Sequence, residues 1–359
     1  MISAALLALV RCPDCHQGLA GATDRLVCQG CGRAYESPSD FLDLRPREPF
    51  AEQTKYLDDA LHVDARHERV SPPLLGSKIR NDMLRAFLAP KPGERIVDLG
   101  CGSGRALLWN RDLGASTVGI DIAPFFSHEA RAGIDLLLGD LRRLPFADGT
   151  FDKAWSLDVL EHLSPEALAA MLKEAARVLK PGGSLFVYTH VRKNARIAIG
   201  LRWINRLAGR LERIGLVDLR QERLRKSDHL NPLRDVPHLE AVVRAAGFRI
   251  GKIRYYTPIV GGFVENILMR MGERALAKRA RRHSERPASE AQGTENHDGG
   301  NGAADAAVRQ ARSHAKQLIA QRGPTYAALQ GLSLAMKLDL LLFGRVRSGP
   351  FFALLVKER

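Results

Sequence analysis

A glycine-rich turn after a short apolar run constrains this chain more than any other segment. Residues 95–104 read RIVDLGCGSG, which predicts a buried strand, a turn at the three glycines and a helix that starts near Arg105. Glycine permits a positive φ and lets the backbone approach a ligand where a Cβ would intrude. Open α/β sheets use a strand, a glycine loop and a helix in this order to bind a nucleotide at the carboxyl edge.

The spacing of the glycines argues against a dinucleotide. The dinucleotide fingerprint is G-x-G-x-x-G, and counted from Gly100 its third glycine would stand at position 105, which is Arg105. The spacing is instead G-x-G-x-G, preceded by Asp98. A second predicted strand, 117–120, ends in Asp121, about twenty residues on, where a carboxylate can accept both hydroxyls of a ribose.

The following segments continue the alternation of strands and helices. Apolar runs predict strands at 134–138, 151–157 and 184–189, with a helix over 165–179 and a turn at 180–183 before the last of them. An earlier helix is predicted over 77–88, ended by two prolines. The order predicts a parallel sheet.

In order and spacing, five segments resemble the consecutive motifs of class I S-adenosylmethionine-dependent methyltransferases. They are DLGCGSG, GIDIA, LLLGDLRRLPFADGTFD, WSLDVLEHL and RVLKPGGSLFVYTH, and they cover about residues 84–190. The likeness is greatest to the group that includes quinone-biosynthesis methyltransferases. It implies an α/β fold with a Rossmann-like sheet of seven strands and helices on both faces. Residues 248–256 and 351–357 would be strands six and seven, the last antiparallel, with 257–350 a long insertion.

The resemblance also implies which residues bind the cofactor S-adenosylmethionine. They are Asp98, Gly100, Gly102, Gly104, Asp121, Ile122, Asp140, Leu141 and Asp158. Asp98 and the glycine loop would hold the methionine end, because free N–H groups suit a carboxylate and Asp98 suits an ammonium. Asp121 would bind the ribose, Asp140 would accept from the adenine amine, and the two apolar residues would flank the adenine. The alternative for each aspartate is a helix cap or a turn residue.

Two residues after the fourth strand, Asp158 and His162, are predicted to be catalytic, between cofactor and acceptor. Methyl transfer is an SN2 displacement at a sulfonium carbon, in which the protein mainly aligns nucleophile, methyl and leaving sulfur. A base is needed only for a hydroxyl or an acidic carbon, and His162, His190 and His229 are the candidates. Asp158 could equally be a helix N-cap, and His162 a packing residue.

Four of the five cysteines form the pattern C-x2-C-x12-C-x2-C: Cys12, Cys15, Cys28 and Cys31. Two such knuckles supply four thiolates in tetrahedral geometry and leave no open position, so the predicted zinc is structural. A redox pair and two disulfides are the alternatives. The surrounding segment is too small for a good core and would fold on zinc. It resembles the zinc-ribbon domain that is a partner of some methyltransferases or is fused to them, as in a ribosomal RNA guanine methyltransferase.

The predicted organisation has four parts. They are a zinc ribbon (1–46), a methyltransferase domain with a cap segment and basic helices (47–283), a disordered linker (284–305), and C-terminal helices with the last strand (306–359). The linker has almost no large apolar side chains. The ribbon and the sheet domain are expected to have separate cores. No signal peptide and no apolar run of about eighteen residues is evident, so the expected location is the cytoplasm, with peripheral contact at the inner membrane surface.

Basic charge is concentrated in one part of the chain. Residues 192–282 hold 22 Lys/Arg against 8 Asp/Glu, a net of +14, equal to the formal net charge of the whole chain. Within them, 194–214 predicts an amphipathic helix with arginines on one face, and 264–282 predicts a second basic helix. Such helices can lie on an anionic membrane, hold nucleic acid, or pack over the domain with their arginines in water.

Three functions follow from these patterns. The first is a methyltransferase acting on a small-molecule or lipid-like acceptor, favoured by the basic amphipathic helices. The second is an RNA methyltransferase that uses the ribbon and the basic surface, although DVLEHL replaces the Asn/Asp-Pro-Pro-aromatic tetrad of amino-group methylases that act on bases. The third is a cofactor-binding scaffold without catalysis, and the intact loop and its acidic partners argue against it.

Overall fold

The computed structural model describes most of the chain. The described residues are 2–38, 40–48, 70–190, 199–217, 229–230, 232–256, 260–272, 274, 323–347 and 350–358. The predicted linker at 284–305 lies outside them. So do most of the cap segment and, in the second basic helix, residues 273 and 275–282.

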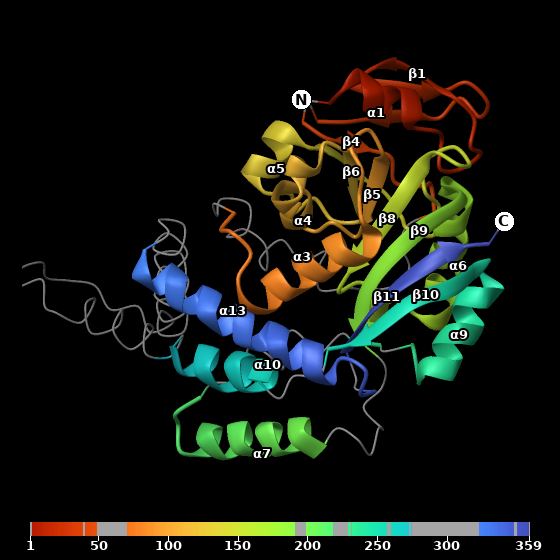
Figure 1. The fold of residues 1–359 in the computed structure, drawn as a ribbon. Coiled ribbons are helices and arrows are strands. Elements are labelled where there is room, and N and C mark those ends of the chain that lie inside the picture. The colour runs from red at the N-terminus through yellow and green to blue at the C-terminus, as the bar shows by residue number, and fades with distance from the viewer. Residues whose placement is uncertain are drawn as a thin grey trace, which may run out of the picture.

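A central sheet of eight strands forms the body of the α/β fold, in the order β10-β11-β9-β8-β5-β6-β7-β4 (Figure 1). The strands are β4 (Leu42–Asp43), β5 (Arg95–Leu99), β6 (Ser116–Asp121), β7 (Asp135–Leu138), β8 (Phe151–Leu157), β9 (Leu179–His190), β10 (Phe248–Tyr255) and β11 (Pro350–Lys357). All neighbours pair in parallel except β11, which is antiparallel to both β9 and β10.

Two details of the sheet differ from the sequence prediction. The sheet has eight strands, not seven, because β4 from the N-terminal segment pairs with β7 through Leu42 and Leu137. The predicted turn at 180–183 is part of β9, which begins at Leu179 opposite Phe151 and shifts register before Ser184. The seven predicted strands are otherwise present, with β11 antiparallel between β9 and β10 as the resemblance implies.

Helices cover both faces of the sheet because successive strand side chains point to opposite sides. Val97 belongs to the core under α6 (Pro165–Val178) and α9 (Val236–Ala245). Its neighbour Ile96 belongs to the core on the other face. That face is covered by α3 (Leu75–Leu88), α4 (Arg105–Trp109), α5 (His128–Gly133) and α13 (Pro324–Phe343). Two short 3-10 helices, η3 (Arg111–Leu113) after α4 and η4 (Leu160–His162) after β8, complete the connections.

The N-terminal unit packs directly on the sheet. It consists of α1 (Ala4–Leu9) and an antiparallel sheet of β1 (Leu19–Ala22), β2 (Arg25–Cys28) and β3 (Ala34–Glu36). Leu6 and Val10 lie in the same buried cluster as Val97, and Val10 bridges to Phe146. The expectation of separate cores is therefore wrong, because α1 fills an apolar surface at the edge of the large sheet.

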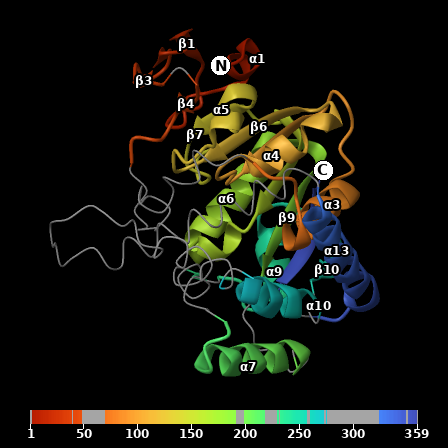
Figure 2. The ribbon, with the colours of Figure 1, turned by 90° about the vertical axis from the view of Figure 1, so that its left-hand side faces the viewer.

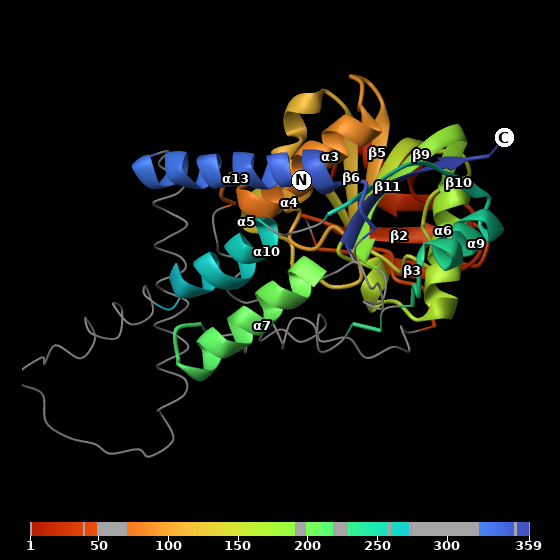
Figure 3. The same cartoon turned by 60° about the horizontal axis from the view of Figure 1, so that its bottom comes forward.

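Three helical segments form a layer at the other end of the sheet (Figures 1 and 3). Helix α7 (Ile199–Arg213) lies within the predicted 194–214. Helix α10 (Val260–Phe263), continued by the π-helical turn η5 (Val264–Leu268), lies between α7 and α13. Figure 2 shows α13 running beside α3, with α7 outermost. Among the described residues, α13 is long and apolar enough to cross a membrane, although the sequence analysis expected no such segment.

Candidate functional site

A cavity of about 670 Å³ opens where β5, β6 and β8 end. Its volume falls in the range of pockets that hold small molecules. The predicted residues in its wall are Asp98, Gly100, Gly102, Asp121, Ile122, Asp140, Leu141, Asp158 and His162. Gly104 does not line the cavity and is the N-cap residue of α4. The carboxyl ends of adjacent parallel strands meet at one edge, so residues far apart in the chain converge here.

The glycine loop requires glycine for two separate reasons. Gly100 has φ +84°, and a Cβ there would lie 2.4 Å from a methyl group of Val159. Gly102 has φ +53° and nothing within 4 Å of the Cβ position, on the side where it lines the cavity. The first glycine is therefore needed for packing against the loop after β8. The second leaves the backbone open to a ligand.

Asp121, at the end of β6, ties the glycine loop to the sheet. Its two carboxylate oxygens accept hydrogen bonds from the amides of Gly102, at 2.8 Å, and Ala123, at 3.0 Å. Each carboxylate oxygen can accept more than one hydrogen bond. The side chain can therefore hold the loop and still accept from a ribose hydroxyl.

Asp98 is a buried acid at the wall of the cavity. Its residue is 2% exposed, and burial together with the nearby charge of Asp121 raises the pKa of Asp98 to about 8. A carboxyl in this state is mostly protonated at neutral pH. A cation placed against it, such as an amino-acid ammonium, would stabilise the charged form and lower the pKa again.

Asp140, at the end of β7, has a close partner within the chain. The guanidinium of Arg142 reaches both of its oxygens, with Nη2 to Oδ2 at 2.6 Å and Nε at 3.0 Å from each, and the Arg142 amide donates to Oδ1. These bonds occupy the acceptor positions that the sequence analysis assigned to adenine. An adenine amine that donates to Asp140 would therefore share the carboxylate with Arg142.

Asp158 stands in a conformation unusual for its residue type. Its φ is +56°, its carboxylate is half exposed, and it lies 3.7 Å from Nε of Arg80 on α3. The N-cap of η4 is Val159, so the alternative of Asp158 as that helix cap does not describe this structure. Backbone strain of this kind is concentrated at functional sites. His162 lies three residues after Val159, and its ring packs edge-on against His229 at 4.6 Å.

The wall residues that the sequence analysis did not predict include two polar residues of α3, and it also missed one buried acid beside the site. Arg80 and Asn81 of α3 line the cavity, but no local pattern marks them. Arg80 also lies over the ring of Tyr188. Glu161 is buried beside the site, where its carboxylate accepts from Oγ1 of Thr189 at 2.8 Å. Burial, with the charge of Asp158, raises the pKa of Glu161 to about 8.

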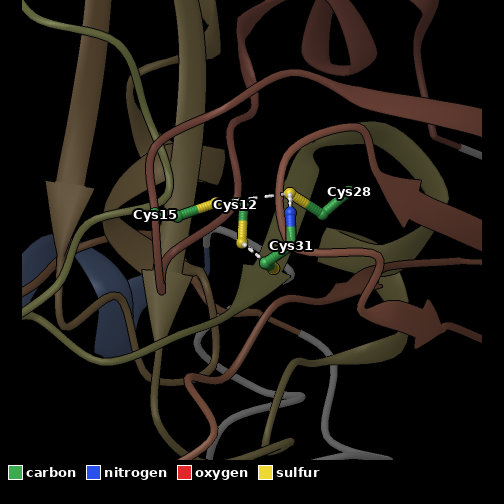
Figure 4. Close-up of side chains that lie close together, drawn as sticks. All are labelled: Cys12, Cys15, Cys28 and Cys31. Atoms are coloured by element: carbon green, nitrogen blue, oxygen red, sulfur yellow. Dashed lines mark hydrogen bonds between the residues drawn. The ribbon is translucent and has the colours of Figure 1, made fainter.

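The four cysteines of the N-terminal unit converge on one point (Figure 4). All four Sγ atoms lie within 4.8 Å of one another, with Cys12 and Cys31 at 3.8 Å and Cys15 and Cys28 at 3.4 Å. None is in a disulfide. Four sulfurs bound to zinc at about 2.3 Å would be about 3.8 Å apart. The thiols therefore fit a tetrahedral metal ion, and Tyr35 supports them with its hydroxyl 3.1 Å from Sγ of Cys12.

Comparison with known proteins gives consistent matches. Residues 97–187 match the family described as a methyltransferase domain. The probable tRNA methyltransferase 9B of Mus musculus is 33% identical over 42% of this chain and 35% of that protein. The demethylmenaquinone methyltransferase of Corynebacterium kroppenstedtii is 42% identical over 29% of this chain and 44% of that protein. The solved structure of Haemonchus contortus phosphoethanolamine N-methyltransferase 2 with S-adenosyl-L-methionine has a TM-score of 0.48 at 16% identity, covering 87% of this chain and 62% of that one.

The matched region is limited in extent. The matched part of the chain spans less than half the length of each of these two curated relatives. The matched residues contain β6 to β8, most of β5 and β9, the glycine loop, and Asp98, Asp121 and Asp140. Residues 97–187 of this chain are therefore similar to a methyltransferase domain, and this similarity covers the strands and the loop that form the cavity.

Proposed function

We propose that this chain transfers the methyl group of S-adenosylmethionine to a small-molecule or lipid-like acceptor at the surface of an anionic membrane. The observation that carries the proposal is a methyltransferase cavity beside a layer of helices that expose large apolar side chains together with arginines. The names of the relatives support the class of reaction but not one acceptor, since one is a probable tRNA methyltransferase and another acts on demethylmenaquinone.

The residues of the cavity have complementary tasks in this proposal. When bound, the cofactor supplies a methyl group made electrophilic by a positive sulfur. Asp98 accepts from the ammonium of its methionine part, and the amides of the glycine loop donate to its carboxylate. Asp121 accepts from the ribose hydroxyls, and Ile122 and Leu141 flank the adenine. The remaining wall, with Asp158 and His162, is left for the acceptor.

Affinity for S-adenosylhomocysteine is expected to rise with pH up to about 8. The pKa of Asp98 is about 8 without ligand, and the ligand ammonium favours the carboxylate, so binding releases a proton below that pH. Affinity therefore rises by up to ~10-fold per pH unit and levels off above pH 8. Calorimetry at pH 6, 7 and 8 measures this rise. The variant Asp98→Asn should bind S-adenosylhomocysteine weakly, and its affinity should not rise with pH. An unchanged slope in Asp98→Asn would contradict the role of Asp98.

Helix α13 presents an apolar stripe to the outside. Leu334, Leu338, Leu341 and Leu342 are exposed, the last two by 79% and 71%. Their spacing of four, three and one residues places them on one helix face. The opposite face packs inward through Met336 and Leu340. An exposed stripe of this size marks an interaction surface, and lipid is an occupant that would bury it at roughly 25 cal/mol per Å².

Helix α7 adds basic charge and an aromatic residue. Trp203 is 64% exposed and Leu207 is also exposed, as are Arg206 and Arg210. The apolar face predicted from the sequence is divided, because Ala208 is buried and the helix contacts η5. Anionic lipid attracts such a segment by about 1 kcal/mol for each basic residue near the surface. Residues 194–198 of the predicted helix lie outside the described residues.

Replacing exposed leucines of α13 is expected to abolish binding to anionic liposomes. The variant Leu338→Ser/Leu341→Ser removes apolar contact with lipid and little packing within the protein, since both side chains are more than half exposed, so its melting temperature should stay within a few degrees (about 2 °C) of wild type. Co-sedimentation with phosphatidylglycerol vesicles measures the binding. Val27→Ser, an exposed apolar residue of the N-terminal unit, is the matched control and should bind normally.

An RNA methyltransferase is the second candidate, favoured by the arginines of α7 and the cysteine cluster. RNA would contact the arginines and not the leucine stripe. Retention of RNA by both wild type and the double leucine variant, with no liposome binding by either, would replace the membrane proposal with this one.

A further inference from the structure

A second group of metal-type side chains lies beside the cofactor cavity, separate from the cysteines. Glu161 and His162 come from η4, and His229 comes from a segment far along the chain. One ligand atom from each of the three lies within 4.8 Å of the others. His190, at the end of β9, completes the group with Nε2 at 3.2 Å from Nδ1 of His229 and Nδ1 at 3.6 Å from Oε1 of Glu161.

We infer that Glu161, His162 and His229 bind a divalent transition-metal ion. Two imidazoles and one carboxylate form a donor set that suits zinc and its first-row neighbours. Ligands at about 2.1 Å from one ion in tetrahedral geometry would be about 3.4 Å apart. The three ligand atoms, all within 4.8 Å of one another, are therefore already near the spacing that one ion requires.

Neighbouring side chains contact two of the three ligands and orient them, as in metal sites. Metal-binding histidines are commonly oriented by a hydrogen bond at their other ring nitrogen. Nε2 of His190 lies 3.2 Å from Nδ1 of His229, a contact that orients the imidazole of His229. Thr189 donates to Oε2 of Glu161 and leaves Oε1 toward the histidines. The cluster thus has one oriented carboxylate and one oriented imidazole before any ion arrives.

The place of the ion suggests the class of acceptor, a step that rests on the proposed function. His162 lines the cofactor cavity, and three protein ligands leave a coordination position open. A hydroxyl group bound there would lose its proton to solvent more readily. Its oxygen pair would then form the O–C bond to the methyl carbon while the C–S bond breaks and its electron pair stays on sulfur. The products are a methyl ether, a neutral thioether and one released proton, so the acceptor is a hydroxyl compound.

Counting zinc in the full chain tests the metal site. Calorimetric titration with Zn²⁺ should give two sites per chain for wild type, one at the cysteines and one at the cluster. His229→Ala and the conservative Glu161→Gln should each bind one equivalent, with the second site weakened at least tenfold. His128→Ala, an exposed histidine of α5, is the matched control and should bind two. Equal zinc content in wild type, His229→Ala and Glu161→Gln would overturn the inference.

S-adenosylhomocysteine binding separates this inference from the proposed function. His229 and Glu161 do not line the cavity, so both variants should bind S-adenosylhomocysteine as wild type does, which also shows that they are folded. Loss of the second zinc with intact ligand binding supports the site. Wild type that binds two zinc ions but no S-adenosylhomocysteine would refute the proposed function and leave the metal site standing.

Discussion

Asp121→Ala is expected to weaken binding of S-adenosylhomocysteine by roughly a hundredfold or more. The carboxylate accepts from the amide of Gly102, so its removal frees the glycine loop as well as removing the acceptor for the ribose. A hydrogen bond to a charged group contributes about 1.5–3 kcal/mol, and the variant loses its hydrogen bonds to both ribose hydroxyls. Each 1.4 kcal/mol of lost binding free energy lowers the affinity about tenfold. Isothermal titration calorimetry measures the loss directly.

The control for this experiment is a surface aspartate. Asp148→Ala removes a carboxylate that is exposed and paired with Arg177, away from the cavity wall. It should bind S-adenosylhomocysteine as wild type does. The same titration with NAD decides the nucleotide, since the glycine spacing disfavours a dinucleotide. Equal or tighter binding of NAD by wild type would refute the assignment of the cofactor.

Cys12→Ser is expected to destabilise the whole chain and not the N-terminal unit alone. Structural zinc contributes on the order of 10 kcal/mol to the folding of small domains, and Leu6 and Val10 bury their side chains in the core of the large sheet. Loss of even about 5 kcal/mol corresponds to a fall in melting temperature of roughly 7 °C at this chain length, because the entropy of unfolding is about 2.1 cal/mol/K per residue. Differential scanning fluorimetry and zinc analysis measure the two effects.

A chelator provides the internal control for the cysteine variant. Wild-type protein treated with chelator should melt near the temperature of chelator-treated Cys12→Ser, and chelator should lower the melting temperature of the variant far less than that of wild type. One melting transition is expected in each case because the two units share a core. Zinc bound at wild-type level by Cys12→Ser, with an unchanged melting temperature, would contradict the structural role of the cysteines.

The strands around the cofactor cavity could be predicted because their signals are local. The strands β5 to β8 are short apolar runs with a glycine or an aspartate at their end or directly after it. Strand β8, for example, occupies the predicted residues 151–157. Parallel strands in a sheet are buried on both faces, so their sequences are apolar throughout and easy to recognise. The cysteine spacing is equally local, since four thiols at fixed short intervals can meet without help from distant residues.

The partners of the predicted site residues could not be found in this way. Asp140 was assigned to adenine, yet Arg142, two residues on, occupies its oxygens in the structure. Both residues are visible in the sequence, but the side-chain geometry that joins them is not. Glu161 was unremarked because an acid after a strand looks exposed. Its burial beside β9, where Thr189 donates to its carboxylate, is decided by the tertiary structure.

The sequence by itself determined the order of the strands, the glycine loop, the positions of the acidic residues after them and the cysteine pattern, because hydrophobic period, backbone freedom and ligand spacing act over a few residues. Only the tertiary structure decided that the N-terminal unit shares the core of the sheet, and that α13 packs on α3 with the hydroxyl of Ser333 accepting from the amide of Leu75. It also decided that His229 meets Glu161 and His162. These contacts join residues tens to hundreds of positions apart. Their free energy comes from burying surfaces that exist only once the separate elements have formed.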